Sequence, residues 1–295
     1  MSVPPRTSPP PQPRPLTPAE VHAIERAELE AWGDMYRALP PAFTREFRPE
    51  LREQGDVAYT RCRAIPFVHF NSVLNLGLGA PATEEMLDAL LAAYEAVGIA
   101  RVTVLTLPYS EPAGLPGWLT ARGFTERPGW DRVFRTAPLA GHAVEDAEVA
   151  FVDSRMAPRW TRFLDRWYGL PTAPWLQELV GRDGWHHAVL VQQDEIRAAR
   201  SMYLGPQRTA WLGIEAPVPG VMAPGFADDD RLVRALLGLA ARRETQLAVA
   251  DLAAVQPGRS GPAYDHWEAL GFTVGYRRAH YVRERAASGQ AGRDP

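Results

Sequence analysis

The chain has 295 residues, a mass of 32.6 kDa and a formal net charge of −3, with 46% hydrophobic and 23% charged residues. This is the composition of a soluble globular protein, and so small a net charge gives no electrostatic reason to expect a nucleic-acid or membrane partner. All 32 basic residues are arginine, which excludes lysine chemistry such as a Schiff base or a P-loop lysine. The single cysteine, Cys62, excludes an intramolecular disulfide and a cysteine-based zinc site.

The two ends of the chain look unlike its middle. Residues 1–16 contain seven prolines and little to bury, so we expect a disordered tail there and a second short tail over 286–295. No apolar stretch approaches the length of a bilayer span, and the N-terminus lacks a signal-peptide pattern. We therefore expect a cytoplasmic protein.

The first half begins with a strong helix signal. Thr17, Pro18 and Glu20 form a capping box, which predicts a helix from there to about Leu39, where two prolines stop it. The spacing of apolar residues then predicts strands and helices in alternation. In chain order these are strands at 57–64 and 67–76, a helix over 83–98, a strand at 101–107, a short helix around Trp118 and a strand over 131–135.

The second half repeats this succession. The pattern predicts a strand at 148–152, a helix over 160–168, a hairpin of 186–192 with 196–204, and a strand at 208–215. A helix over 228–243, a strand at 247–252, a helix over 264–270 and a closing strand to Arg283 follow.

The repeat is visible in the residues as well as in the pattern. Gly123-Phe124-Thr125 matches Gly271-Phe272-Thr273, and an arginine lies eleven positions after each phenylalanine, at Arg135 and Arg283. A single Gly-Phe pair after a helix is common, whereas two copies in register are not. We infer two homologous α+β domains, 17–140 and 145–285, joined by 136–147.

The order of elements and the end of the second half carry a family resemblance. That end reads Ala263-Tyr264-Asp265-His266-Trp267-Glu268-Ala269-Leu270-Gly271-Phe272. With it, the second half resembles the GNAT (Gcn5-related N-acetyltransferase) superfamily, and the first half resembles a degenerate copy without its first strand. The whole is similar to tandem GNAT proteins of bacteria. The resemblance implies two GNAT-like domains, each a mixed, mostly antiparallel sheet flanked by helices, with the activity in the C-terminal copy.

The same resemblance implies a cofactor site. Acetyl-CoA would lie between two central strands that separate, its pyrophosphate on the start of the next helix, and would donate its acetyl group to a small-molecule amine. The implied cofactor contacts are Ile214, Ala216, Gly225, Phe226 and Ala227. The stretch lacks the Arg/Gln-x-x-Gly-x-Gly/Ala motif of the family, and three aspartates, 228–230, stand where the pyrophosphate would dock. Their charge opposes a phosphate, although aspartates also suit the first turn of any helix.

Three residues are candidates for proton transfer. Glu215 ends a predicted strand where GNAT enzymes place a base, although it equally suits a solvent-exposed strand end. Tyr264 and His266 lie on the last helix, near the position of the family's tyrosine acid, which here is Trp267. Either side chain could donate a proton, and either could simply pack in the core.

Aromatic residues gather in the second half. In GNAT folds the first two helices roof the acceptor pocket, so we expect Trp167, Tyr168, Trp185 and Trp211 to line it, with core packing as the alternative role. His186 and His187 are adjacent on a strand and point to opposite faces, so we expect no metal site there.

Three functions are compatible with these patterns. The first is an acyltransferase that moves an acetyl group from CoA to a small amine. The second is a GNAT-scaffold enzyme of a biosynthetic pathway that does not use acetyl-CoA. The third is a non-catalytic binding or scaffolding protein. The oligomeric state is left open.

Overall fold

The computed structural model describes residues 15–136, 139 and 146–284, and within them the strands form one continuous sheet. Its order is β1-β2-β3-β4-β11-β5-β10-β9-β8-β7-β6. The strands of the first half are β1 (Glu50–Gln54), β2 (Val57–Arg61), β3 (Ser72–Leu74), β4 (Arg101–Thr106) and β5 (Thr125–Thr136). Those of the second half are β6 (Val149–Phe151), β7 (Trp185–Gln192), β8 (Glu195–Leu204), β9 (Thr209–Ala216), β10 (Leu247–Leu252) and β11 (Thr273–Glu284).

Helices cover this sheet on both sides. In the first half they are α1 (Pro18–Arg37), α2 (Pro41–Phe47), α3 (Glu84–Ala96), α4 (Leu115–Ala121) and the 3₁₀ turn η1 (Val68–Phe70). In the second half they are α5 (Ala157–Tyr168), α6 (Ala173–Leu176), α7 (Ala227–Arg242), α8 (Pro262–Ala269) and the turns η2 (Gln177–Leu179) and η3 (Pro257–Arg259).

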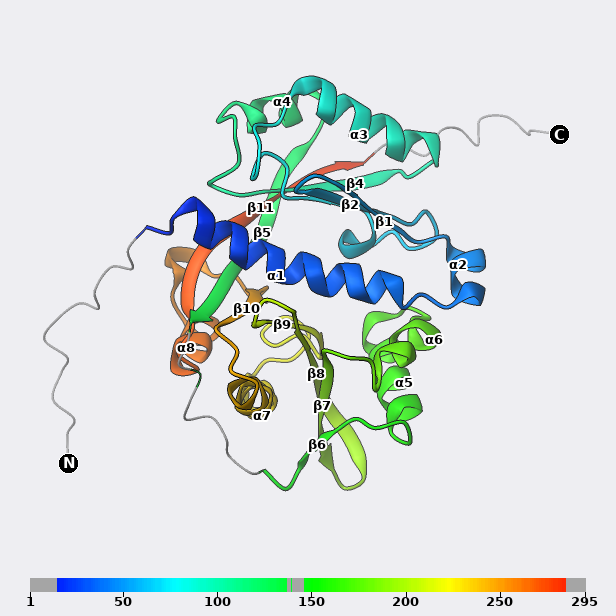
Figure 1. Ribbon diagram of the computed structural model, residues 1–295, viewed down its shortest axis with the longest axis vertical. Helices are drawn as coiled ribbons and strands as arrows, with labels where there is room; N and C mark the ends of the chain where they lie inside the picture. Colours follow the sequence, from blue (N-terminus) through cyan, green and yellow to red (C-terminus); the bar gives the residue numbers. More distant parts are fainter. Residues whose placement is uncertain (1–14, 137–138, 140–145, 285–295) are drawn as a thin grey trace, which may run out of the picture.

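The two halves exchange their last strands. β11, from the end of the chain, pairs antiparallel with β4 of the first half, and β5 pairs antiparallel with β10 of the second half. β5 and β11 also pair with each other at the centre of the sheet (Figure 1). Each half therefore supplies a strand that the sheet of the other half needs, and the two sequence repeats share one sheet.

The repeated Gly-Phe motif marks equivalent points of the two halves. Gly123 and Gly271 follow α4 and α8 with φ of 82° and 77°, a left-handed conformation that glycine adopts without strain. The repeated arginines contact the motif of the opposite half. Arg135 Nη1 donates to the carbonyl oxygen of Leu270 at 2.7 Å, and the Arg283 guanidinium lies over the Phe124 ring at 5.5 Å.

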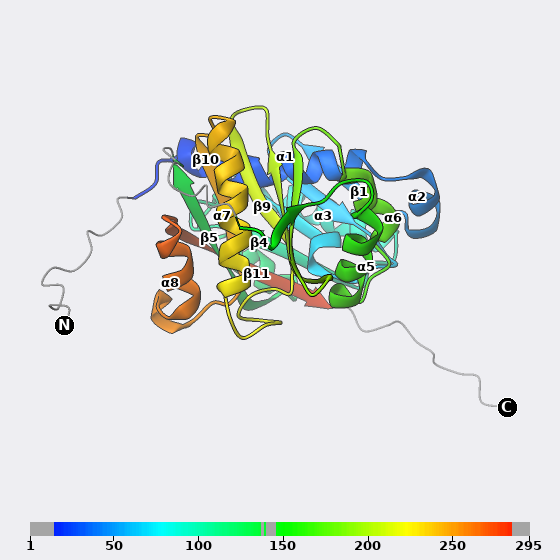
Figure 2. The same cartoon turned by 90° about the horizontal axis from the view of Figure 1, so that it is seen from below.

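Successive side chains of a strand point to opposite faces of the sheet and pack in two different hydrophobic cores. In β7, Ala188 and Leu190 pack in the core that contains α7 and α8, whereas Val189 between them packs with α1, α5 and α6. Figure 2 shows the strands lying between α7 and the pair α5–α6.

α1 belongs to the first half and packs on strands of the second. The predicted capping box is present: the Glu20 amide donates to Thr17 Oγ1 at 3.3 Å, and the Thr17 amide donates to Glu20 Oε2 at 2.8 Å. The helix crosses the middle of the molecule and contacts β9 and β10 (Figure 1). Its buried face carries Trp32 and Met35 together with two carboxylates, Glu25 and Glu28.

Most of the predicted elements are present, with several differences. α6 was not predicted, and β5 begins at Thr125, before the predicted strand over 131–135. The expected strand over 67–76 is wrong for its first part, because residues 68–70 form a 3₁₀ turn held by the bond from the Phe70 amide to the Phe67 carbonyl. The two prolines that end α1 also begin α2, and β1 was not predicted, since its exposed polar residues lack an apolar face. The expected tails lie outside the described residues, except for residues 15 and 16, as does most of the expected connection over 136–147.

No helix among the described residues is long and apolar enough to cross a membrane.

Candidate functional site

β9 and β10 run side by side and then separate. They pair in parallel from Thr209 with Leu247 to Leu212 with Ala250, and no further pair follows. Beyond that point Ile214 has a φ of 49°, and the register between β8 and β9 slips. This β-bulge turns the end of β9 away from β10 and places Glu215 at the opening.

A cavity of about 280 Å³ lies against this opening, and we call it the central cavity. Both halves of the chain line it: α1 and η1 from the first half, and α5, α6, β9 and β10 from the second. Most of its lining is aromatic or aliphatic, and the acidic lining residues are Glu28, Glu215 and Asp251. A much smaller space, about 10 Å³, lies near α7 and shares Glu215 and Asp251 with the central cavity.

Glu215 is the most unusual carboxylate of the opening. Burial raises its pKa above the ordinary value, and the Arg200 guanidinium, 3.9 Å away, opposes that shift. Its side chain remains 20% exposed, and it reaches the central cavity. The Tyr168 hydroxyl donates to the Glu215 carbonyl oxygen at 2.6 Å and so fixes the end of β9 against α5.

Arg200 connects Glu215 to the last helix. It is fully buried on β8 and donates from Nε to Asp229 Oδ1 at 2.5 Å. The other oxygen of Asp229 lies 3.1 Å from His266 Nε2. The ion pair with Arg200 and the contact with His266 hold the pKa of Asp229 below its usual value in spite of burial. Glu215 and His266 are therefore the ends of one polar chain, whose middle members are Arg200 and Asp229.

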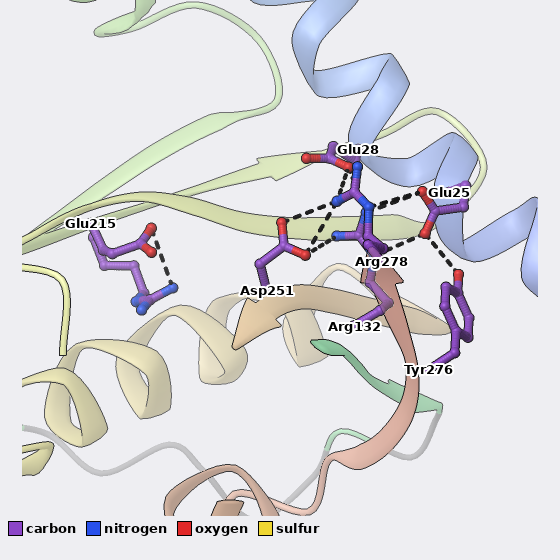
Figure 3. A network of polar contacts seen from close by, with 8 residues as sticks. Glu25, Glu28, Arg132, Glu215, Asp251, Tyr276 and Arg278 are labelled. Carbon is purple, nitrogen blue, oxygen red and sulfur yellow. Dashed lines mark hydrogen bonds and ion pairs between the residues drawn. The ribbon is translucent and has the colours of Figure 1, made fainter. Parts of the chain in front are cut away.

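A second polar network includes Asp251 and extends from it in the direction away from Glu215 (Figure 3). Two buried arginines, Arg132 of β5 and Arg278 of β11, stand among three carboxylates, Glu25, Glu28 and Asp251. Arg132 Nη2 lies 2.5 Å and Arg278 Nη1 lies 2.7 Å from Glu28 Oε2. The exchange of strands thus brings the charged groups of both halves together behind the central cavity.

Comparisons with known proteins identify this architecture. The sequence matches no protein-family model and no curated protein. Among solved structures, a GCN5-related N-acetyltransferase from Kribbella flavida superposes with a TM-score of 0.56 at 10% identity, covering 90% of this chain and 96% of that one. A tandem GNAT protein from the clavulanic acid biosynthesis pathway superposes with a TM-score of 0.54 at 15% identity, covering 92% and 96%. This chain has the tandem GNAT fold. A GCN5-related N-acetyltransferase from Sphaerobacter thermophilus agrees, with a TM-score of 0.52, 13% identity and 92% and 94% coverage.

In this tandem GNAT fold the predicted pyrophosphate position, at the start of α7, does not fit a CoA pyrophosphate. Asp229 turns inward to Arg200, and Phe226 stacks on His266 with ring centroids 5.1 Å apart. Three prolines of the loop before α7, at 217, 219 and 224, have no amide hydrogen to donate. The loop folds on itself through the bond from the Met222 amide to the Val218 carbonyl. The start of α7 therefore presents carboxylates and has little free space, whereas a bound pyrophosphate needs hydrogen-bond donors and room.

The other expected cofactor contacts are spread over different surroundings. Ile214 lines the central cavity, Ala216 is fully buried in the core, and Gly225 and Ala227 are exposed at the start of α7. In the first half, Gly77 and Gly79 stand before α3 as a phosphate loop would. A side-chain carbon at Gly77 would meet the Glu111 backbone, and one at Gly79 would meet the Asp56 side chain, so packing within this chain uses these glycines.

The structure separates the candidates for proton transfer. Tyr264 is 1% exposed, and its hydroxyl donates to Asp131 Oδ2 at 2.7 Å, in a cluster with Arg277 of β11. It does not line the central cavity. His266 is 8% exposed and reaches Glu215 only through Asp229 and Arg200.

The expected aromatic pocket is present in part. Tyr168 and Trp211 line the central cavity. Trp185 instead donates from Nε1 to Asp34 Oδ2 at 2.9 Å, and its ring meets Trp211 edge-on. Trp167 is 39% exposed and packs against Phe163.

His187 of the adjacent histidine pair is buried, and its Nδ1 lies 2.7 Å from Ser201 Oγ. In the part of the chain that the structure describes, no three histidine, cysteine or acidic side chains are grouped to hold a metal ion.

Sequence reasoning missed the contribution of the first half to this cavity. Glu28, Trp32, His69 and Trp130 line it, and none was a candidate. One signal was present: Glu25 and Glu28 occupy the same helical stripe as Ile24, Ala31 and Met35, where a carboxylate needs a buried partner.

Proposed function

We propose that this chain is an acyltransferase whose acceptor is an amine bound in the central cavity. The tandem GNAT fold supports acyl transfer as the class of reaction. The observation that carries the proposal is Glu215, a carboxylate of raised pKa placed by a β-bulge at the opening of β9 and β10 and facing the cavity.

Glu215 acts on the amine. An ammonium group that enters the cavity must lose a proton before its nitrogen can attack a carbonyl carbon. The Glu215 carboxylate accepts that proton and becomes a neutral acid, a form that burial favours. Arg200 lies near enough to limit the rise of the pKa, so that the carboxylate is present to act as a base.

The acyl donor is the second half of the proposal. The fold implies an acyl-CoA such as acetyl-CoA, which would supply a carbonyl activated as a thioester. The start of α7 does not fit its pyrophosphate, so a donor that serves this chain must hold its phosphates elsewhere or carry its acyl group in another form.

Thermal unfolding with and without acetyl-CoA and CoA tests the donor directly. A ligand present at a hundred times its dissociation constant stabilises a protein by about 2.7 kcal/mol, which gives a clear shift of the midpoint. The same samples, incubated with a panel of amines, are examined by mass spectrometry for acylated product. A shift together with product supports the proposal.

No shift and no product at millimolar acetyl-CoA would contradict its use as donor. The function to test next would then be that of a GNAT scaffold adapted to a reaction without acetyl-CoA, for which the closed start of α7 is the supporting observation.

A further inference from the structure

The central cavity has mostly apolar walls, and its charged lining groups are all acidic. Aromatic rings and aliphatic chains form most of its lining, among them Trp32, Trp130, Trp175 and Trp211. The charged groups that reach it are all carboxylates, those of Glu28, Glu215 and Asp251. A small molecule that fills this space must match both the walls and the charge.

The network behind the cavity contains more carboxylates than arginines. The carboxylates are Glu25, Glu28 and Asp251, and the cations are Arg132 and Arg278, so the formal charge of this group is −1. Arg132 is 0% exposed and Arg278 2%. The arginines are enclosed, whereas Asp251, 17% exposed, and Glu28 reach the cavity. The excess negative charge therefore lies on the cavity side.

The second polar chain adds a carboxylate to the cavity wall. Arg200 faces Asp229 and Glu215, and His266 contacts the second oxygen of Asp229. Arg200 is 2% exposed, and Glu215 is the member that reaches the cavity. Both groups thus present carboxylates to one apolar space, a charge that is costly to bury without a compensating cation.

We propose that the central cavity binds an arylalkylamine, with the aromatic body among the tryptophan rings and the protonated amine at Asp251, Glu28 and Glu215. This inference rests on the proposed function for the chemical consequence of binding, and names the class of its acceptor. The cation supplies the charge that the network behind the cavity lacks, and the ring removes its apolar surface from water on entry. Exposed apolar side chains of the lining, Phe67 at 45% and Met222 at 41%, extend this apolar character beyond the buried walls.

The test is binding to the unmodified full-length protein without any acyl donor, measured by calorimetry and thermal unfolding. The probes are 2-phenylethylamine and tryptamine. The matched controls are 2-phenylethanol, which lacks the charge, 3-phenylpropanoate, which reverses it, and ethylamine, which lacks the ring. We expect the two arylalkylamines to bind at least tenfold more tightly than every control. Equal binding of the alcohol or of ethylamine would overturn the inference, and so would the absence of binding by both arylalkylamines.

Two variants locate the site. Asp251→Asn removes the cavity-side charge and should weaken 2-phenylethylamine at least tenfold, whereas Asp230→Asn, whose carboxylate pairs with Arg234 outside the cavity lining, should leave binding unchanged. Leu170→Trp fills cavity space and keeps every charge, and it should weaken the amine even if Asp251→Asn does not fold. Undiminished binding to a folded Leu170→Trp protein would place the ligand elsewhere and contradict the inference.

Binding and turnover separate the two proposals. Arylalkylamine binding without any acylated product would keep the ligand class and contradict the acyltransferase. Acylation of a hydrophilic amine, with no binding of the aryl probes, would keep the acyltransferase and contradict the ligand class.

Discussion

The surroundings of Glu215 disfavour the ionised form of its carboxyl group. Burial raises its pKa, so the folded protein binds a proton there more readily than the unfolded chain does. The stability associated with that proton is present below the unfolded pKa, about 4.3, and is lost as the pH rises through the raised value. The ionised form of Glu215 thus opposes folding, and it is this form that can act as a base.

We expect Glu215→Gln to separate activity from stability. Amine acylation should fall by about 10²- to 10⁴-fold, since a general base is lost. The free energy of unfolding at pH 7 should not decrease, because no buried charge remains at this position. Steady-state kinetics and chemical denaturation measure the two quantities, with Glu244→Gln, an exposed partner of Arg208, as control.

The pH dependence of the same reaction follows from the direction of the shift. The charged groups around Glu215 are Arg200, Asp229 and Asp251, and the Tyr168 hydroxyl contacts its carbonyl. In the wild type the rate should rise with pH through an apparent pKa above that of an ordinary glutamate. Retention of this acidic limb in Glu215→Gln would assign it to another group and contradict Glu215 as the base.

His280 gives a residue-scale prediction that is independent of function. Burial and the neighbouring Arg278 lower the pKa of His280 to about 3, and it is 7% exposed in an edge-on contact with Trp130. The unfolded chain binds a proton at about pH 6.5, so stability is lost as the pH falls from there toward 3. Between pH 7.5 and 4.5 this amounts to roughly 2–3 kcal/mol.

The measurement is the free energy of unfolding at these two pH values. The acid-induced loss should be roughly 2–3 kcal/mol smaller in His280→Gln than in wild type, because the variant has no group that gains a proton on unfolding at this position. His22→Gln, at an exposed position, is the matched control. An equal loss in wild type and His280→Gln would show that His280 is protonated in the folded protein.

At the scale of elements, the bulge of β9 and the position of α1 decide where chemistry can occur. Regular pairing of β9 with β10 would leave no opening, and Glu215 would take the orientation that simple alternation gives it. α1 closes the cavity from the opposite half and carries Glu28 and Trp32 to its wall. The two features come from segments nearly two hundred positions apart in the sequence, and neither makes a cavity alone.

Arg135 tests the exchange of strands at this scale. It ends β5 and donates to the Leu270 carbonyl oxygen, just before the glycine that follows α8. Arg135→Ala should lower the free energy of unfolding by about 1 kcal/mol, the usual net value of such a bond. Arg127→Ala, at an exposed position of the same strand, should change it by less than about 0.5 kcal/mol. Equal effects of the two variants would mean that the contact across the halves contributes nothing.

At the scale of the whole molecule, the shared sheet makes the halves depend on each other. β5 lies between β10 and β11, and β11 lies between β4 and β5. A half expressed alone would expose a long unpaired edge, and its last strand would have lost its partners on both sides. Buried charges would also be left without partners, since Arg132 of the first half and Asp251 of the second pair with each other.

We therefore expect residues 15–140 and 146–284, produced separately, to lack cooperative unfolding transitions. Produced together, they should associate and recover one. Circular dichroism and calorimetry with analytical ultracentrifugation measure this. Two separately folded, monomeric halves would contradict the dependence and would instead support two autonomous domains.

Local signals in the chain were enough to predict the secondary-structure elements and the repeat. Capping residues, prolines and apolar spacing act over a few positions, so α1, α3, α7 and the strands of the second half could be predicted within a few residues. The Gly-Phe-Thr repeat predicted a duplicated fold, and the tandem GNAT neighbours confirm that fold. Glu215 was a candidate because the family resemblance implies a base at this strand end, and the structure places it at the central cavity.

Contacts between residues far apart in the chain could not be predicted in this way. Strand exchange depends on pairing between segments far apart in the chain. The alternation of polar and apolar residues within a strand does not show which strand it pairs with. For this reason Asp251, Glu28 and Trp130 were not candidates, although they line the same cavity as Glu215. The role of Tyr264 could not be predicted either, because its hydroxyl donates to Asp131 Oδ2, 2.7 Å away, and Asp131 belongs to the other half of the chain. Secondary-structure propensity depends on neighbouring residues. The cavity and its charge depend on contacts between the two halves, which form only when the chain folds.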